Sequence, residues 1–163
     1  MKTAACVCFA AMLCLHPARA FSADVFEARV QGTAWIAERS FAVATSIAGK
    51  PAINLVGRIE GKPSAMISFN LVLAQADRCA GRYALGGSVL ASHGSYQAKT
   101  GADADPLADS YRFIDGAVTI DACDTATHAI SGSFAAHARN SAGAVIDIEG
   151  GRFAQTVAAA AVP

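Results

Sequence analysis

The chain has 163 residues, with 13 Lys and Arg, 13 Asp and Glu, and a formal net charge of 0. A balanced charge without a basic cluster provides no attraction for a phosphate backbone or an anionic membrane surface, which excludes nucleic acid as an expected partner. A chain of this length suits one domain that can fold without a metal or several disulfides.

Residues 1–20 have the three parts of a cleavable export signal. Lys2 gives a basic start, residues 4–15 form an apolar run, and Ala18 and Ala20 are the small residues that precede a cleavage site. The run is shorter than the roughly 20 residues that a spanning helix needs. We therefore expect a periplasmic or secreted protein that begins after Ala20 and has no stable membrane span.

Processing changes the charge and the set of possible anchors. Loss of Lys2 and Arg19 leaves 11 basic against 13 acidic residues, a net charge of −2. Lipidation of Cys14 is an alternative to free secretion, but the preceding residue is the bulky Leu13, where a small residue is normal.

Of the five cysteines, only Cys79 and Cys123 follow the expected cleavage point. A pair in an oxidising compartment indicates a disulfide, which would stabilise the fold by roughly 4 kcal/mol in the loop-entropy treatment. Two buried free thiols are the alternative. A catalytic dithiol is disfavoured because no Cys-x-x-Cys is present.

The first half of the processed chain alternates apolar and polar residues with period two, which predicts strands. The predicted elements, in chain order, are a strand over 25–31, a turn at Gly32-Thr33, a strand over 35–46, a hairpin about Gly61-Lys62-Pro63 that joins 53–59 to a central strand over 65–74, strands at 83–85 and 89–99, and an acidic loop over 100–109.

The second half predicts a meander with recognisable turn chemistry. Asp115-Gly116 separates 111–114 from 117–122, and Asp-Gly is a strong hairpin signal because glycine accepts positive φ. The predicted elements that follow are a strand over 129–139, a turn over 140–143, a strand over 144–149, a reversal at Gly150-Gly151 and a strand over 152–157.

About ten short strands at near-regular spacing predict an all-β fold, either an antiparallel β-sandwich or a flattened β-barrel. We expect a single all-β domain over 21–157. The segment 158–163 has no partner pattern and is predicted to be a frayed tail.

Two segments resemble a family of small secreted or lipid-anchored bacterial envelope proteins of unknown function. Residues 26–37 contain its V-x-G-x-x-W-x-A opening, and Gly81-Arg82-Tyr83 stands where the family has a Gly-Thr-Tyr strand start. Residues 130–134 (ISGSF) and 145–153 (VIDIEGGRF) resemble its closing meander. The resemblance implies an all-β envelope domain and assigns no catalytic residue.

Three acidic residues, Asp103, Asp105 and Asp109, form the weak candidate for a metal site. Hard cations prefer several oxygen ligands, and D-x-D-x-x-x-D supplies three. The spacing differs from that of an EF-hand, and no bidentate Glu closes the loop. We therefore expect an ordinary solvated loop and no cofactor.

Histidine and serine chemistry are disfavoured as well. His93, His128 and His137 remain after processing, but His128 and His137 lie nine positions apart, which on one strand places them on opposite faces. No G-x-S-x-G elbow occurs, so Ser131 is interpreted as a strand residue. Carboxylate pairs, Asp121 with Asp124 or Asp147 with Glu149, remain open by residue type alone.

Four aromatic residues, Trp35, Tyr83, Tyr96 and Tyr111, are candidate ligand-binding residues because amphipathic rings combine contact area with a polar group. Core packing is the alternative, and it is favoured for Trp35.

Our leading hypothesis is a non-catalytic exported envelope domain that binds a protein, a glycan or a small ligand. A small β-barrel that carries an apolar ligand is the second hypothesis, since alanine-rich strands leave interior room. An unrecognised hydrolase is the third.

Overall fold

The computed structural model describes residues 24–61, 63–88 and 90–159. The predicted export signal lies outside these residues, as does most of the predicted tail. The described part contains ten strands and no helix, so no helix within it could cross a membrane.

The strands differ widely in length, from four residues in the shortest to fifteen in the longest. They are β1 Val25–Val30, β2 Thr33–Ile36, β3 Arg39–Ile47, β4 Lys50–Ile59, β5 Ala65–Val72, β6 Gly81–Ala84, β7 His93–Gln97, β8 Ser110–Asp124, β9 Ala129–Asn140 and β10 Val145–Ala158.

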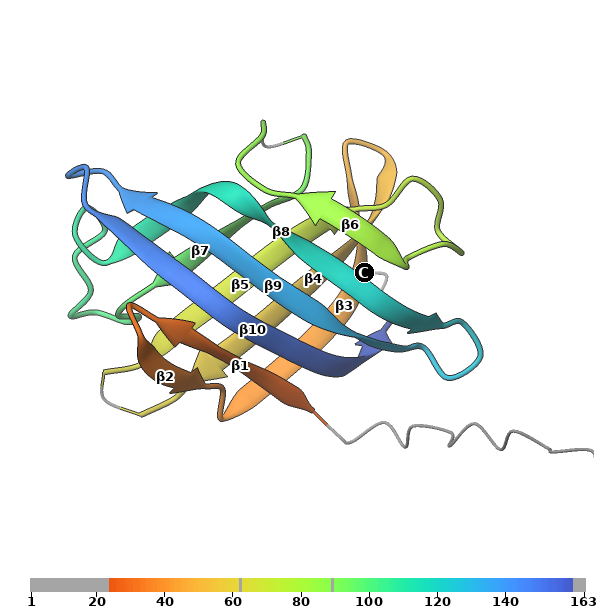
Figure 1. Ribbon diagram of the computed structural model, residues 1–163, viewed down its shortest axis with the longest axis horizontal. Coiled ribbons are helices and arrows are strands. Elements are labelled where there is room, and N and C mark those ends of the chain that lie inside the picture. Colours follow the sequence, from red (N-terminus) through yellow and green to blue (C-terminus); the bar gives the residue numbers. More distant parts are fainter. Residues whose placement is uncertain (1–23, 62, 89, 160–163) are drawn as a thin grey trace, which may run out of the picture.

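Seven of these strands form a closed barrel, in the order β10-β3-β4-β5-β7-β8-β9 and back to β10 (Figure 1). The hairpin of β1 and β2 lies beside β10, and β6 lies beside β8. The prediction of an all-β fold of about ten strands is confirmed. One pairing differs from the predicted antiparallel pattern, because β10 and β3 run parallel where they close the ring.

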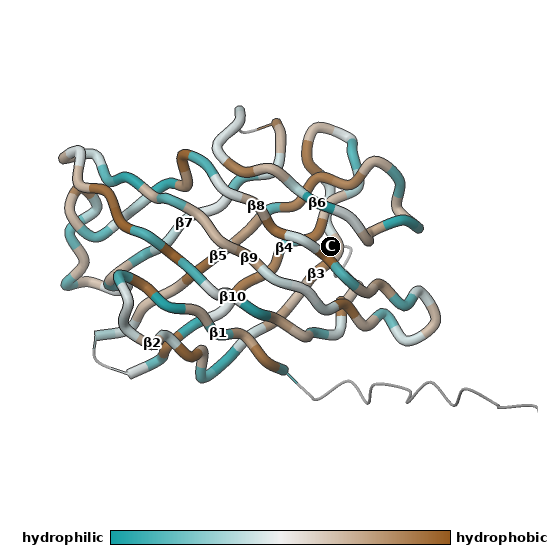
Figure 2. The backbone as a smooth tube through the Cα atoms, in the orientation of Figure 1, coloured by the Kyte–Doolittle hydropathy of each residue, from teal (hydrophilic) through white to brown (hydrophobic). Residues whose placement is uncertain are grey.

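Aromatic side chains fill the middle of the barrel. Along β5 every second residue is buried, and Phe69 packs with Phe26, Phe113 and Phe134 at ring-centroid distances of 6.4, 5.2 and 4.9 Å. Hydrophobic and hydrophilic residues alternate along the strands in Figure 2, as a sheet with one inner and one outer face requires. The middle of the barrel is therefore a packed aromatic core.

Gly57 of β4 lets a strand pass directly over an aromatic ring. A Cβ at this position would lie 2.4 Å from Cδ1 of Phe26, a separation that no side chain tolerates. The absence of a side chain at Gly57 thus makes room for the ring of Phe26, which is itself buried.

Two predicted turns, Asp115-Gly116 and Gly150-Gly151, are wrong. β8 continues through the first and β10 through the second, each with a β-bulge at that place. Gly116 and Gly150 have φ of 114° and 58°, which glycine adopts at a bulge as readily as in a hairpin turn. The bulges bend two long strands around the barrel where we expected four short ones.

Two other predicted strands have different bounds. The predicted strand over 35–46 is divided between β2 and β3, and the chain changes direction where the Glu38 amide donates to the Arg58 carbonyl at 2.9 Å. The predicted strand over 89–99 is reduced to β7, since residues 90–92 form a turn whose Ser92 hydroxyl accepts a hydrogen bond from the Val72 amide.

Cys79 and Cys123 form the predicted disulfide, with their Cα atoms 5.9 Å apart. It ties the segment between β5 and β6 to the C-terminal end of β8, across 44 positions of sequence. One end of the barrel is therefore cross-linked.

Candidate functional site

A pocket, here called the end pocket, opens at the cross-linked end of the barrel. It forms where β3, β8 and β10 end and where β4 and β9 begin, and its volume is about 490 Å³. Most of its wall is apolar and comes from strands far apart in the sequence. Its apolar lining includes Ala44, Ile53, Leu73, Cys79, Ile130 and Val157.

The polar groups of the end pocket include Asp124 and His128. Asp124 accepts hydrogen bonds from the amides of Ala126 and Thr127 at 2.8 and 3.2 Å. These bonds, with the Thr127 contribution the largest, hold the pKa of the Asp124 carboxyl below its usual value. This ionised carboxylate is engaged in closing the turn between β8 and β9, and the wall of the pocket below it is apolar.

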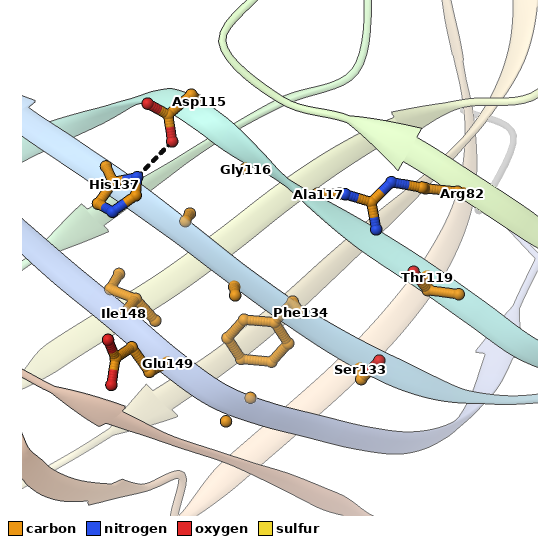
Figure 3. Close-up of a pocket in the computed structure, with 14 residues that line it drawn as sticks. Arg82, Asp115, Gly116, Ala117, Thr119, Ser133, Phe134, His137, Ile148 and Glu149 are labelled. Carbon is orange, nitrogen blue, oxygen red and sulfur yellow. Dashed lines mark hydrogen bonds and ion pairs between the residues drawn. The ribbon is translucent and has the colours of Figure 1, made fainter.

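A second hollow, here called the outer groove, lies on the outside of the barrel over β6, β8, β9 and β10 (Figure 3). Its volume is about 460 Å³. Small residues form its floor, among them Gly116, Ala117, Ala135 and Gly150. The groove exists because these outward positions on three neighbouring strands lack the long side chains that usually cover a sheet.

One end of the outer groove is acidic and centred on His137 of β9. Its Nδ1 lies 2.5 Å from Oδ1 of Asp115 on β8, and its Nε2 lies 3.4 Å from Oδ1 of Asp147 on β10. The hydrogen bond that His137 donates to Asp115, and then the charge of Asp115, raise the pKa of His137, with further contributions from the charges of Asp147 and Glu149. When it is protonated, His137 bridges β8, β9 and β10.

The raised pKa of His137 makes the stability of the barrel depend on pH. The contribution is fully present below the ordinary value of 6.5 and is lost as the pH rises through the higher pKa of the folded state. We expect urea unfolding between about pH 5 and about pH 9 to show a stability difference between wild type and His137→Gln that shrinks as the pH rises.

Asp115→Asn is the matched control for this pH dependence, since it removes the largest cause of the shift while His137 remains. The difference in free energy of unfolding between wild type and Asp115→Asn should also shrink as the pH rises. A difference between wild type and His137→Gln that stays constant across this range would contradict the assignment.

The four aromatic candidates do not converge on one site. Trp35 is 5% exposed and packs edge-on against Phe26 at 5.9 Å, as expected of a core residue. The Tyr83 hydroxyl donates to the Cys79 carbonyl at 2.6 Å, and Tyr96 and Tyr111 pair at 6.0 Å near the other end of the barrel. None of the four lines the end pocket or the outer groove.

Burial raises the pKa of the Tyr83 phenol. The pKa of Tyr96 is raised first by burial and then by the charges of Tyr111 and Asp109. Both phenols thus stay protonated at neutral pH, and the Tyr83 hydroxyl acts as a hydrogen-bond donor at the edge of the core.

The acidic loop uses its carboxylates to hold its own backbone. Asp109 accepts from the Asp105 amide at 2.9 Å, and Asp105 accepts from the Leu107 amide at 2.8 Å. Asp109 also pairs with Lys99 at 3.9 Å, and Asp103 is exposed. Within residues 24–61, 63–88 and 90–159, no group of His, Cys, Asp or Glu is arranged to hold a metal ion.

The three histidines lie in separate places. His93 on β7 contacts the Asn70 amide nitrogen at 3.3 Å, His128 lines the end pocket, and His137 lines the outer groove. The premise that His128 shares a strand with His137 is wrong, because β9 begins at Ala129 and His128 has a turn conformation with φ of 57°.

Sequence reasoning missed the residues that form both hollows. The end pocket depends on strand order, which joins Ala44, Ile130 and Val157 across most of the chain and leaves no local signal. The outer groove did have a signal: Ala117 and Ala135, cross-strand partners on β8 and β9, occupy positions whose side chains point outward.

Comparisons of the chain with protein families, with curated proteins and with solved structures find no match. The family resemblance of the opening and closing motifs gains no support from them. Of the two hollows, the end pocket, with its apolar wall on a cross-linked barrel, is the stronger candidate for a ligand site.

Proposed function

We propose that this chain is an exported, non-catalytic binding protein that holds a small apolar molecule in the end pocket. The observation that carries the proposal is a pocket of about 490 Å³ with a mostly apolar wall at an open end of a closed barrel. Pockets for small ligands have volumes of roughly 300–1,000 Å³ and combine apolar walls with a few polar groups.

The packing of the barrel limits the size of the ligand. Phe69 and Leu55 are completely buried in the core of the barrel and do not line the end pocket. The proposed ligand is therefore compact, since the pocket holds about 490 Å³.

The sequence and the disulfide support export. Residues 1–20 have the pattern of a cleavable signal, and a disulfide persists in oxidising compartments such as the periplasm or the extracellular space. A carrier in such a compartment would hold an apolar molecule away from water.

Filling the end pocket with a large side chain should abolish binding. Ala44 lies on β3 opposite the buried Ile53, and it lines the pocket. We expect Ala44→Trp to weaken binding of the neutral fluorophore N-phenyl-1-naphthylamine at least about tenfold, since the indole would occupy the volume that the probe requires. Fluorescence titration measures the change.

Ala142→Trp is the control, since Ala142 is an exposed residue of the β9–β10 turn and lines neither hollow. This variant should bind the probe as wild type does. In NMR spectra of wild type, addition of the probe should shift the amide signals of Ile53, Ile130 and Val157. Binding that survives Ala44→Trp unchanged, or no binding by wild type, would refute the proposal.

A further inference from the structure

We infer that the outer groove is a second site, which binds a short peptide with free termini. The ammonium group would lie at the acidic end near Asp115 and Glu149, and the carboxylate would lie at Arg82. This inference is independent of the end pocket, which opens at one end of the barrel, whereas the groove lies on its outer side.

The two ends of the groove have opposite charge. Asp115, Asp147 and Glu149 outnumber the cations beside them, which are His137 when protonated and Arg29, the cross-strand partner of Glu149, so the acidic end stays net negative. Arg82 lies at the opposite end of the groove, with the hydroxyl residues Thr119 and Ser133 nearby (Figure 3). A ligand with a cation at one end and an anion at the other matches this arrangement.

The Arg82 guanidinium is available for an anion. Arg152, which lies in the same row but three strands away on β10, already pairs with Glu27, whereas Arg82 makes no ion pair and no side-chain hydrogen bond with any residue that the structure describes. A guanidinium presents several N–H donors in a planar fork, which suits two-point binding of a carboxylate.

The length of the groove selects the length of the peptide. Arg82 pairs with Thr119, and Asp115 lies four positions before Thr119 on β8, about 13 Å along the strand. The Arg82 side chain reaches back toward Ala117 in Figure 3, so its guanidinium points toward the acidic end. An extended tripeptide spans about 10 Å between its termini, which is shorter than this backbone separation and therefore fits between the two charged ends.

The floor of the groove fits a peptide backbone. Ala117 and Ala135 are cross-strand partners with outward-pointing methyl groups, and Gly116 and Gly150 lie at the two bulges beside them. The small residues of this floor leave room for the backbone of a ligand to approach the sheet.

Calorimetric titration of the processed protein with Ala-Ala-Ala at neutral pH tests the inference. We expect binding, and we expect Arg82→Gln and Glu149→Gln each to raise Kd at least about tenfold, since each removes one charge-assisted contact. Arg78→Gln, a change at an exposed arginine outside the groove, should leave Kd unchanged.

Blocked peptides assign each terminus to its end of the groove. Wild type should bind the C-terminal amide of Ala-Ala-Ala at least about tenfold more weakly than the free peptide, whereas Arg82→Gln should bind the two peptides equally. In the same way, N-acetylation should weaken binding to wild type but not to Glu149→Gln. Ala-Ala and a tetra-alanine peptide should bind more weakly than Ala-Ala-Ala. Absence of peptide binding, or a loss with the amide that is equal in wild type and Arg82→Gln, would overturn the inference.

Discussion

Replacing both Cys79 and Cys123 with serine is expected to lower the free energy of unfolding by about 4 kcal/mol. The disulfide restricts an unfolded chain across 44 positions of sequence, and its loss gives that freedom back to the unfolded state. For a domain of this size the midpoint of thermal unfolding should fall by roughly 12–20 °C. Scanning calorimetry and urea unfolding, followed by the fluorescence of Trp35, measure both changes.

Wild-type protein that has been reduced is the matched control for the double variant. Its unfolding curve should coincide with that of the double variant, because both lack the cross-link and keep side chains of similar size. Cys79 and Cys123 also line the end pocket, so the double variant should bind N-phenyl-1-naphthylamine more weakly while still folded. A loss of stability below about 1 kcal/mol would show that the cross-link does not constrain the unfolded chain as described.

Phe69→Ala should lower the free energy of unfolding by about 3–5 kcal/mol, a loss comparable to that expected on removal of the disulfide. The ring is completely buried and contacts the rings of Phe26, Phe113 and Phe134. Its removal leaves a cavity that strands on opposite sides of a closed barrel cannot collapse to fill. Chemical denaturation with a constant m-value gives the difference.

Phe41→Ala makes the same chemical change on the outside of the barrel and serves as the control. Phe41 is 49% exposed on β3, so its loss should change stability by no more than about 1 kcal/mol. Because Phe69→Ala removes so much stability, Phe69→Leu provides a milder variant, with a smaller loss in the same direction. Equal losses of stability for Phe69→Ala and Phe41→Ala would contradict the placement of Phe69 in the core and Phe41 on the outside.

The fold was predictable to the extent that it depends on local alternation. The period-two pattern of β5 follows from the burial of every second side chain, and the same holds for most of β9. Asp115-Gly116 and Gly150-Gly151 were misinterpreted because a hairpin turn and a β-bulge both use glycine at positive φ. The choice between them depends on the partner strand β9, which a local pattern does not contain.

Sequence alone anticipated little of the two hollows. Ala44 and Val157 both line the end pocket because β10 pairs with β3. This pairing is parallel, and no turn motif in the sequence predicts it. In the outer groove, His137 faces Asp115 because a bulge shifts the register of β8 between Phe113 and Asp115. Aromatic residues were chosen as candidates for their chemistry, but their size gives them a greater gain from burial in the core.

The short parallel seam between β10 and β3 has a consequence for biosynthesis. It consists of the pairs Val157 with Ala42 and Ala158 with Val43, which join one of the earliest strands to the last. During translation β3 must wait for β10, so the ring cannot form until β10 has left the ribosome. A nascent polypeptide of this topology therefore cannot close its barrel while β10 is still being made, which would leave time for threading through a narrow translocation channel.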